Sequence, residues 1–338
     1  MLQTASFHMP TPALRFRDAL KATCIAALCA AHVILATPVS AQRYPNKPIR
    51  VVVAFGPGGI ADTVARLIGQ KLADGYGQQV VVDNRPGAGG TLGAKLVAGA
   101  SPDGYTLLVI TAAVAVNASA AREAVDPRSE LTAVALTAST PTIFAVHRSV
   151  TAKSLMDYLR GAKNGRFTYS TAGVGTTEHL TSEYLFRAVS GFDATHVPYQ
   201  GGAAPVTAVA GQQVDLTTTT VPTAFPLIKQ GSLRVMAVAS HKRIAVLPEV
   251  PTLAESGFPD FENASWIAYF APAKTPAAIA QGLNAEINKA LRQADVRERL
   301  TALGFDAQAS TRAEFADYVK SEVAKWAKVV KTTGITLN

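Results

Sequence analysis

The stretch Ile-Arg-Val-Val-Val-Ala-Phe-Gly-Pro-Gly-Gly-Ile-Ala-Asp, residues 49–62, decides the predicted fold. It begins with a short run rich in β-branched residues, which is typical of a strand buried on both faces. Glycines and a proline at 56–59 end that run, and apolar residues then recur at helical spacing from Ile60 to Leu72. The stretch therefore predicts a strand, a glycine-rich turn and a helix.

The same alternation continues along the chain. A second strand is predicted at 79–83, a helix at 91–98 and a third strand at 105–111, and this βαβαβ order predicts a parallel sheet with helices on its faces. Further strands are predicted near 131–138, 142–147, 167–169, 194–198, 214–219 and 234–239, and helices near 154–163, 176–190, 200–211 and 222–230.

Several helix starts have the spacing of a capping box, in which a hydroxyl residue and an acid three residues later each bind the other's backbone N–H. An amphipathic helix is also predicted near the C-terminus, from Phe315 to Val330. The capping pairs are Ser154 with Asp157, Thr252 with Glu255, and Thr311 with Glu314.

Two connections are continuous and apolar, near 134–146 and 231–240, and no flexible linker lies at a single midpoint. A chain that leaves one lobe and later returns to it makes two such crossings. We therefore expect a discontinuous first lobe of 43–140 and 236–338, an inserted second lobe of 141–235, and a cleft between them.

Composition limits the class of protein. The 338 residues are 48% hydrophobic and 17% charged, which favours packed cores and excludes a disordered chain. The formal net charge is +8, but Lys and Arg are scattered with no basic arm. We therefore expect no nucleic-acid partner, and the charge is expected to favour solubility and the attraction of anions.

The N-terminal residues 1–41 have the pattern of a signal peptide. A basic segment precedes the apolar stretch 22–36, and small residues then lead to Gln42, the predicted mature start. The apolar stretch is short for a membrane span. Both cysteines, Cys24 and Cys29, lie in this leader, so the mature periplasmic chain is expected to have no disulfide, thiol nucleophile or cysteine-bound metal.

The turn Phe55–Asp62 is the first candidate site. Its glycines allow a ligand to approach the backbone, and the free N–H groups of the following helix favour an anion. Asp62 has two interpretations that the sequence leaves open: an acid that stabilises the helix dipole, or a partner for a ligand ammonium or hydroxyl group.

A dinucleotide-dependent oxidoreductase is the alternative interpretation of this turn. Gly56, Gly58 and Ala61 fit the pattern G-x-G-x-x-A, and Asp83 ends the second strand, where a ribose-binding acid belongs. The export signal and Pro57, which has no N–H for a phosphate, weigh against it.

The second candidate site is the loop Ser170–His179, which follows a predicted strand and opens a helix. Its glycines and hydroxyls repeat the chemistry of the first turn, so two such loops facing one cleft would bind a carboxylate that bridges the lobes. Glu178 and Glu183 are predicted on a solvated face. The threonine run 217–220 offers further hydroxyls, some of which are expected to face the cleft.

Enzyme chemistry is not expected. The sequence has no Gly-x-Ser-x-Gly elbow and no histidine pair at metal-binding spacing. The histidines of the mature chain, His147, His179, His196 and His241, are interpreted as structural residues. No catalytic residue, metal or cofactor is predicted.

Several segments together resemble the Bug family, the extracytoplasmic solute receptors of tripartite tricarboxylate transporters. They are Tyr44–Arg50, Gly56–Arg66, Asp83–Gly90, Pro102–Tyr105, Ser170–His179, His196–Gly202 and Leu247–Thr252, in this order through nearly the whole mature chain. The chain departs from the family at Thr217–Thr220 and at Ala120–Ser129, which puts the identity of the ligand in doubt.

The resemblance implies an α/β, two-lobe periplasmic-binding-protein fold (type II-like), with mixed, mostly parallel sheets, that closes on a small carboxylate. It implies a dicarboxylate, tricarboxylate, acidic amino acid or aromatic acid as ligand, and the permease of a tripartite tricarboxylate transporter as partner of a monomeric receptor. A sensor without a transport role remains an alternative. The predicted ligand-binding residues are Phe55, Gly58, Gly59, Ala61, Asp62, Thr111, Ser170, Thr171, Ala172, Gly175, Thr176, Thr177 and Thr219.

Overall fold

The computed structural model of the chain describes residues 44–120, 123–162, 167–258 and 262–333. The chain divides into two compact units, 1–44 and 45–338, and the description that follows concerns the second. The predicted leader and its two cysteines lie outside the described residues. Among the described helices, none is both long enough and apolar enough to span a bilayer.

The strands form one mixed sheet in the order β2-β1-β3-β9-β4-β7-β5-β6, with β8 and β10 paired to β4. Strand β1 is parallel to β2 and β3, and β5 is parallel to β6 and β7, whereas β9 is antiparallel to both of its neighbours. The strands are β1 Ile49–Val53, β2 Val80–Asn84, β3 Thr106–Thr111, β4 Leu131–His147, β5 Phe167–Thr171, β6 Ala194–Pro198, β7 Leu216–Thr220, β8 Leu233–Val238, β9 Ala264–Pro272 and β10 Asp306–Ala307.

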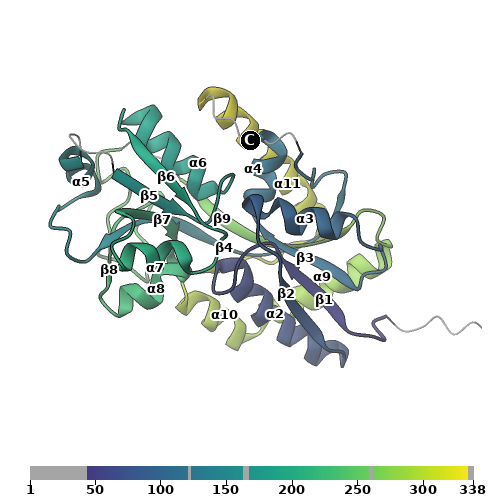
Figure 1. Cartoon of the computed structure of the whole chain (residues 1–338). Helices are drawn as coiled ribbons and strands as arrows, with labels where there is room; N and C mark the ends of the chain where they lie inside the picture. Colours follow the sequence, from purple (N-terminus) through teal and green to yellow (C-terminus); the bar gives the residue numbers. More distant parts are fainter. Residues whose placement is uncertain (1–43, 121–122, 163–166, 259–261, 334–338) are drawn as a thin grey trace, which may run out of the picture. The chain divides into compact units, whose positions relative to one another are not determined.

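The helices accompany two groups of strands. Figure 1 shows α5 to α8 beside β5 to β8, and α2, α3 and α9 beside β1 to β3. Helix α6 continues into a π-helical turn, Tyr184–Val189. The helices are α2 Ile60–Tyr76, α3 Thr91–Ala98, α4 Ala113–Ala120, α5 Leu155–Gly161, α6 Thr177–Glu183, α7 Ala204–Ala210, α8 Val221–Lys229, α9 Ala277–Arg292, α10 Ala294–Ala302 and α11 Arg312–Thr333.

Strand β4 joins the two groups. Residues 131–141 pair with β9, and residues 142–147 pair with β7 and β8 (Figure 1). The sequence analysis predicted two strands here, near 131–138 and 142–147. That prediction was wrong: Thr140 pairs with Ser265 and Pro141 with Ala264, so the strand is continuous.

The predicted strand, turn and helix at 49–72 are confirmed as β1 and α2. Val51, Val52 and Val53 are fully buried, and the apolar stripe of α2 packs inward. The helix ends at Gly77, whose N–H donates to the carbonyl of Ala73 at 2.9 Å with φ of 64°, a left-handed conformation that glycine adopts without steric cost.

Two of the three predicted capping pairs form in both directions, and the pair of Ser154 and Asp157 forms in one. The N–H of Asp157 donates to Ser154, and Thr311 and Glu314 bind each other's backbone N–H. The pair of Thr252 and Glu255 also forms, at 2.8 and 3.1 Å, although a turn rather than a helix follows it.

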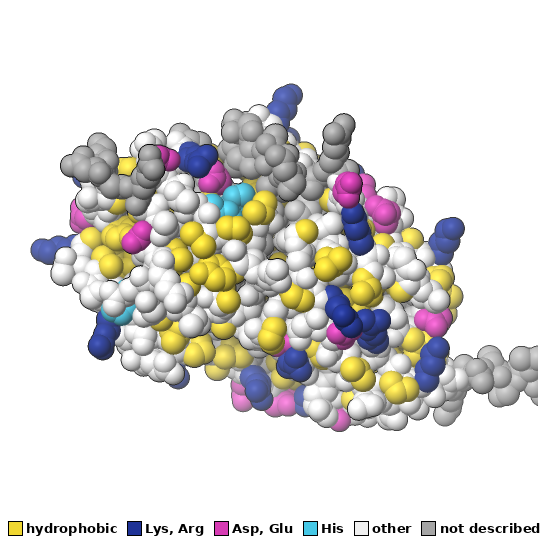
Figure 2. Space-filling model, in the orientation of Figure 1, with side chains coloured by type: hydrophobic (Ala, Val, Ile, Leu, Met, Phe, Trp, Pro, Cys, Tyr) yellow, Lys and Arg dark blue, Asp and Glu magenta, His cyan; other side chains and the backbone are white. Residues whose placement is uncertain are grey.

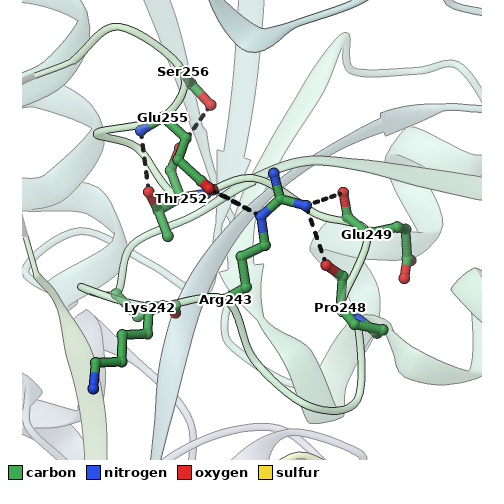
Figure 3. A network of polar contacts seen from close by, with 8 residues as sticks. Lys242, Arg243, Pro248, Glu249, Thr252, Glu255 and Ser256 are labelled. Atoms are coloured by element: carbon green, nitrogen blue, oxygen red, sulfur yellow. Dashed lines mark hydrogen bonds and ion pairs between the residues drawn. The ribbon is translucent and has the colours of Figure 1, made fainter.

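Figure 3 shows how this third pair is held in place. Arg243 donates to Glu255 at 2.9 Å and to the carbonyls of Pro248 and Glu249. The N–H of Val238, the last residue of β8, donates to the carbonyl of Pro251 at 3.0 Å. The segment after β8 is therefore tied back to the sheet before the chain enters β9.

Candidate functional site

A cavity of about 30 Å³ lies where the C-terminal ends of the parallel strands meet. This edge of an open α/β sheet is where ligands usually bind. The lining comes from the last residues of β3 and β7 and from the segments that follow β1, β5, β6 and β7. The lining residues are Phe55, Gly59, Ile60, Ala61, Thr111, Ala172, Thr176, Glu178, Gly201, Gly202, Thr219, Thr220 and Thr223.

The structure brings seven of the predicted site residues together at this cavity. These seven, from both candidate loops and from the ends of β3 and β7, are Phe55, Gly59, Ala61, Thr111, Ala172, Thr176 and Thr219. The other predicted residues lie outside the lining. They are Gly58, Asp62, Ser170, Thr171, Gly175 and Thr177.

Two helices begin at the cavity without a side-chain cap. The N-cap of α2 is Gly59, which has no side chain. The N-cap of α8 is Thr220, whose hydroxyl bonds the hydroxyl of Thr223 and caps no backbone N–H of the helix. The first N–H groups of a helix and its dipole together favour an anion at this position. Thr111 and Thr219 bring hydroxyls to the same lining, so the cavity offers neutral hydrogen-bond donors to an anion. The hydroxyl of Thr176 also lies there but already donates to the carbonyl of Gly173.

Asp62 holds the first loop in place instead of lining the cavity. Its carboxylate accepts from the N–H of Gly58 at 3.0 Å, from Arg66 Nε at 3.0 Å and from Asn84 Nδ2 at 3.0 Å. Burial alone would raise the pKa of Asp62, but the bonds from Arg66, Gly58 and Asn84 outweigh it and lower that pKa. Asn84 also donates to the carbonyl of Phe55, so β2 supports the turn after β1.

The second loop is held by its own hydroxyls. Ser170 Oγ donates to the carbonyl of Pro205 at 3.0 Å. Thr176 Oγ1 donates to the carbonyl of Gly173 at 2.9 Å and accepts from the N–H of His179, as an N-cap residue does. Thr171 Oγ1 lies 2.8 Å from His196 Nε2. Among these residues, Thr176 alone lines the cavity.

Two histidines, His179 buried and His196 partly buried, form a stack beside this loop. The rings of His179 and His196 lie 4.2 Å apart, and Tyr169 stacks on His196 at 4.9 Å. Burial lowers the pKa of both histidines, that of His196 to about 3, so both are neutral at pH 7. His179 Nδ1 accepts from the N–H of Gly175 at 3.4 Å, which agrees with the structural role predicted for both.

Glu178 is buried and the side chain of Glu183 is largely buried, so the solvated face predicted for them was wrong. The side chain of Glu183 is 11% exposed, accepts from the hydroxyl of Tyr169 at 2.6 Å and pairs with Arg187 at 3.2 Å. Glu178 is 6% exposed and lines the cavity. Burial raises the pKa of Glu178. The sequence pattern of a short helix gave no sign that both faces of α6 are covered.

The loops after β1 and β6 touch through their backbones. The N–H of Gly56 donates to the carbonyl of Gln200 at 3.0 Å, and Gly56 and Gly201 form an isolated parallel bridge. A Cβ on Gly202 would lie 2.4 Å from the carbonyl oxygen of Pro57, and φ of Gly202 is 67°. The helix predicted at 200–211 therefore begins only at Ala204, because the glycines are used for this contact.

Six lining residues were missed by sequence reasoning: Ile60, Glu178, Gly201, Gly202, Thr220 and Thr223. Gly201 and Gly202 belonged to a segment already singled out, and Thr220 ended the noted threonine run. Their position after parallel strands was the available signal. Ile60 and Glu178 lay within the candidate segments Phe55–Asp62 and Ser170–His179, but Glu178 was assigned to a solvated face.

Two further observations concern metal-binding clusters and the distribution of surface charge. Within the described residues, no cluster of three or more His, Cys, Asp or Glu could hold a metal ion. On the face drawn in Figure 2, Lys and Arg side chains stand apart or beside Asp and Glu, without a continuous basic stripe.

Comparison with known proteins gives one family and close relatives. Residues 64–335 match the model of the tripartite tricarboxylate transporter family receptor. The chain is 37% identical to a UPF0065 protein in the tcbD-tcbE intergenic region of Pseudomonas sp. strain P51, over 85% of this chain and 86% of the relative. It is 33% identical to Protein BugT of Bordetella pertussis, over 90% and 94%.

Solved structures share the fold. The periplasmic binding protein BugD is 30% identical, with a TM-score of 0.83 over 87% of this chain and 99% of BugD. MatC from Rhodopseudomonas palustris, with bound malate, is 33% identical with a TM-score of 0.80 over 85% and 100%. R. palustris Rpa4515, with adipate, is 34% identical with a TM-score of 0.83 over 87% and 99%.

Proposed function

This chain belongs to the tripartite tricarboxylate transporter receptor family, and from that premise we propose that it captures a small carboxylate in the cavity described above. The family is one of solute-binding receptors, and the predicted Bug-type resemblance and two-lobe fold are confirmed. The candidate ligands are a dicarboxylate, a tricarboxylate, an acidic amino acid or an aromatic acid. Relatives with malate and adipate support this class.

The proposal rests mainly on one observation: two helix N-termini without a side-chain cap and several threonine hydroxyls border the same cavity. The start of α2 and the start of α8 border the cavity, and five threonines line it. No Lys or Arg is among the lining residues, so backbone N–H groups and hydroxyls would bind the carboxylate.

The proposed contacts are the seven predicted residues that line the cavity. We expect the six predicted residues outside the lining to act by shaping the loops, because Asp62, Ser170 and Thr171 already use their polar atoms within the protein.

Ligand entry would require movement. A cavity of about 30 Å³ is far below the roughly 300–1,000 Å³ typical of small-molecule sites. In this proposal the lobes, 43–140 with 236–338 and 141–235, separate to admit the ligand and close around it. Since the ligand contacts both lobes only when they are closed, it shifts the population toward closure.

The proposal also covers the export of the chain and its membrane partner. Residues 1–41 would direct the chain to the periplasm as a signal peptide, and the mature monomer would deliver its ligand to a membrane permease. Catalysis and nucleic-acid binding form no part of this function. A sensor without a transport role would differ only in the last step. Measuring ligand uptake by cells with and without the permease would distinguish a transport receptor from a sensor.

A thermal-shift screen of the mature chain tests the proposal. Malate, adipate, citrate, glutamate and benzoate are compared with a nicotinamide dinucleotide. A ligand at 100 times its Kd adds about 2.7 kcal/mol to the free energy of unfolding, which raises Tm by several degrees. At least one carboxylate should stabilise the protein, and the dinucleotide should not.

Two matched variants test whether an increase in Tm with ligand arises from binding in the cavity. Thr219→Val removes a lining hydroxyl and should reduce the carboxylate shift, whereas Thr218→Val, which is buried in the same strand outside the lining, should leave it in place. Stabilisation by the dinucleotide alone would contradict the proposal and support the oxidoreductase alternative.

A further inference from the structure

Glu178 is the single titratable residue among the thirteen that line the cavity. It is 6% exposed, and the remaining lining consists of Phe, Ile, Ala, Gly and Thr residues. Its Oε2 accepts from Thr177 Oγ1 at 3.2 Å. A carboxyl group therefore lies on the lining of a cavity whose other polar side chains are threonines, and threonine hydroxyls are suited to bind an anion.

No cation neutralises this carboxyl group within the described part of the chain. Arg187, in the π-helical turn after α6, pairs with Glu183, and Arg66 of α2 pairs with Asp62. The neighbouring imidazoles, His179 and His196, stack on each other and are neutral at pH 7. The lining residues of β3, β7, α8 and the loop after β6 are not titratable.

We propose that Glu178 is protonated when a carboxylate ligand is bound, that it donates a hydrogen bond to that ligand, and that binding therefore takes up a proton. The inference rests on the proposed function. Two carboxylates that share a small, water-poor site cannot both be ionised without a large repulsion, so the ligand's charge favours the neutral form of the residue. A neutral carboxyl then becomes a donor like the threonines around it.

Burial acts in the same direction. It already raises the pKa of Glu178 in the protein without ligand, while the hydroxyls of Thr177 and Thr176 and its own backbone N–H oppose the rise. An anion beside the group raises the pKa further, and by linkage protonation must strengthen anion binding by the same factor.

The sign of the pH dependence follows. Where Glu178 is ionised in the free protein and protonated in the complex, a rise in pH weakens carboxylate binding by up to about tenfold per unit. A cationic group on the ligand would give the opposite sign, because an ammonium binds best to the ionised carboxylate. The two ligand chemistries are therefore distinguished by one titration.

The experiment is calorimetric titration of the mature protein with malate, adipate, glutamate and benzoate between about pH 6.5 and 9, where their carboxyl groups stay ionised. Affinity for the carboxylate that binds should fall as pH rises. Glu178→Gln keeps a donor without a titrating proton, so its affinity should be nearly independent of pH. Glu183→Gln, on the same helix but outside the lining, should keep the dependence of the parent.

A second measurement does not depend on any variant folding. Titrations of the parent in two buffers of different ionisation enthalpy report the protons taken up on binding, and a net uptake is expected where affinity depends on pH. Binding without uptake and without pH dependence would overturn this inference alone. Affinity that rises with pH and is lost in Glu178→Gln would also overturn it, in favour of a cationic ligand group. Binding of none of the four probes at any pH, together with no stabilisation by citrate in the thermal-shift screen, would overturn the proposed function with it.

Discussion

Among single residues, Asp62 fixes the conformation of the turn Phe55–Asp62 and does not line the cavity. Its carboxylate accepts bonds from Gly58, Arg66 and Asn84, which hold the turn after β1 against β2. The sequence left two interpretations of this acid open. The contacts favour a supporting role, because the carboxylate bonds the loop, α2 and β2 and does not line the cavity.

Asp62→Ala is therefore expected to lower the free energy of unfolding by about 2–3 kcal/mol at pH 7, because charge-assisted hydrogen bonds to a buried group are lost. The folded pKa of Asp62 lies below its ordinary value, so the carboxylate stabilises the protein above about pH 4 and this contribution disappears as pH falls through the folded pKa. Chemical denaturation across pH measures both effects.

The control for this prediction is Asp74→Ala, an exposed acid on the same helix, which should change stability little. An unchanged stability in Asp62→Ala would contradict the supporting role. A selective loss of affinity for glutamate over adipate would instead place Asp62 against a ligand ammonium group.

The sequence predicted only those residues of the candidate site that lie at the end of a strand or between a strand and the following helix. Glycines and hydroxyls that follow a strand and precede a helix led to Phe55, Gly59, Ala172 and Thr176, since the ends of parallel strands meet at one edge. The burial of Glu178 at the cavity could not be predicted in this way. Its burial depends on elements distant in sequence that cover α6, and local spacing carries no information about them.

At the scale of elements, strands rich in β-branched residues and long amphipathic helices were predictable, as β1 and α2 show. Strand β9 was not predicted, although it lies between β3 and β4 and its aromatic residues are buried. A uniformly apolar segment has no period that separates a strand from a buried helix. The start of α7 was placed too early for a different reason, because a contact with another loop uses the preceding glycines.

That loop contact gives a prediction at this scale. Gly202→Ala would put a Cβ 2.4 Å from the carbonyl oxygen of Pro57, so the loops after β1 and β6 must move apart. Because both loops line the cavity, adipate affinity should fall by about tenfold or more, equivalent to a change of about 1.4 kcal/mol.

The matched control is Gly231→Ala. Gly231 has a similar φ of 70°, but a Cβ there meets nothing within 4 Å. Both variants should lose about 1–2 kcal/mol of stability from the left-handed backbone, and only Gly202→Ala should lose affinity. Calorimetry and denaturation of the two proteins make the comparison, and equal affinities would show that the loop contact does not affect binding.

At the scale of the whole molecule, the proposed closure predicts a change in dimensions. A ligand that contacts both lobes only in the closed state must increase the closed population. Small-angle scattering of the mature protein should therefore give a smaller radius of gyration with a stabilising carboxylate than without it. The nicotinamide dinucleotide serves as the control, and identical curves with and without a carboxylate that demonstrably binds would contradict closure.

Strand β4 has a further consequence for how the molecule denatures. It supplies hydrogen-bonding partners to β9 along its first part and to β7 and β8 along its last. If either set of neighbours were to melt alone, the shared strand would be left with unpaired peptide groups beside a still ordered sheet, which is energetically costly. Loss of order in one half should therefore spread into the other, so that heating produces a single cooperative transition.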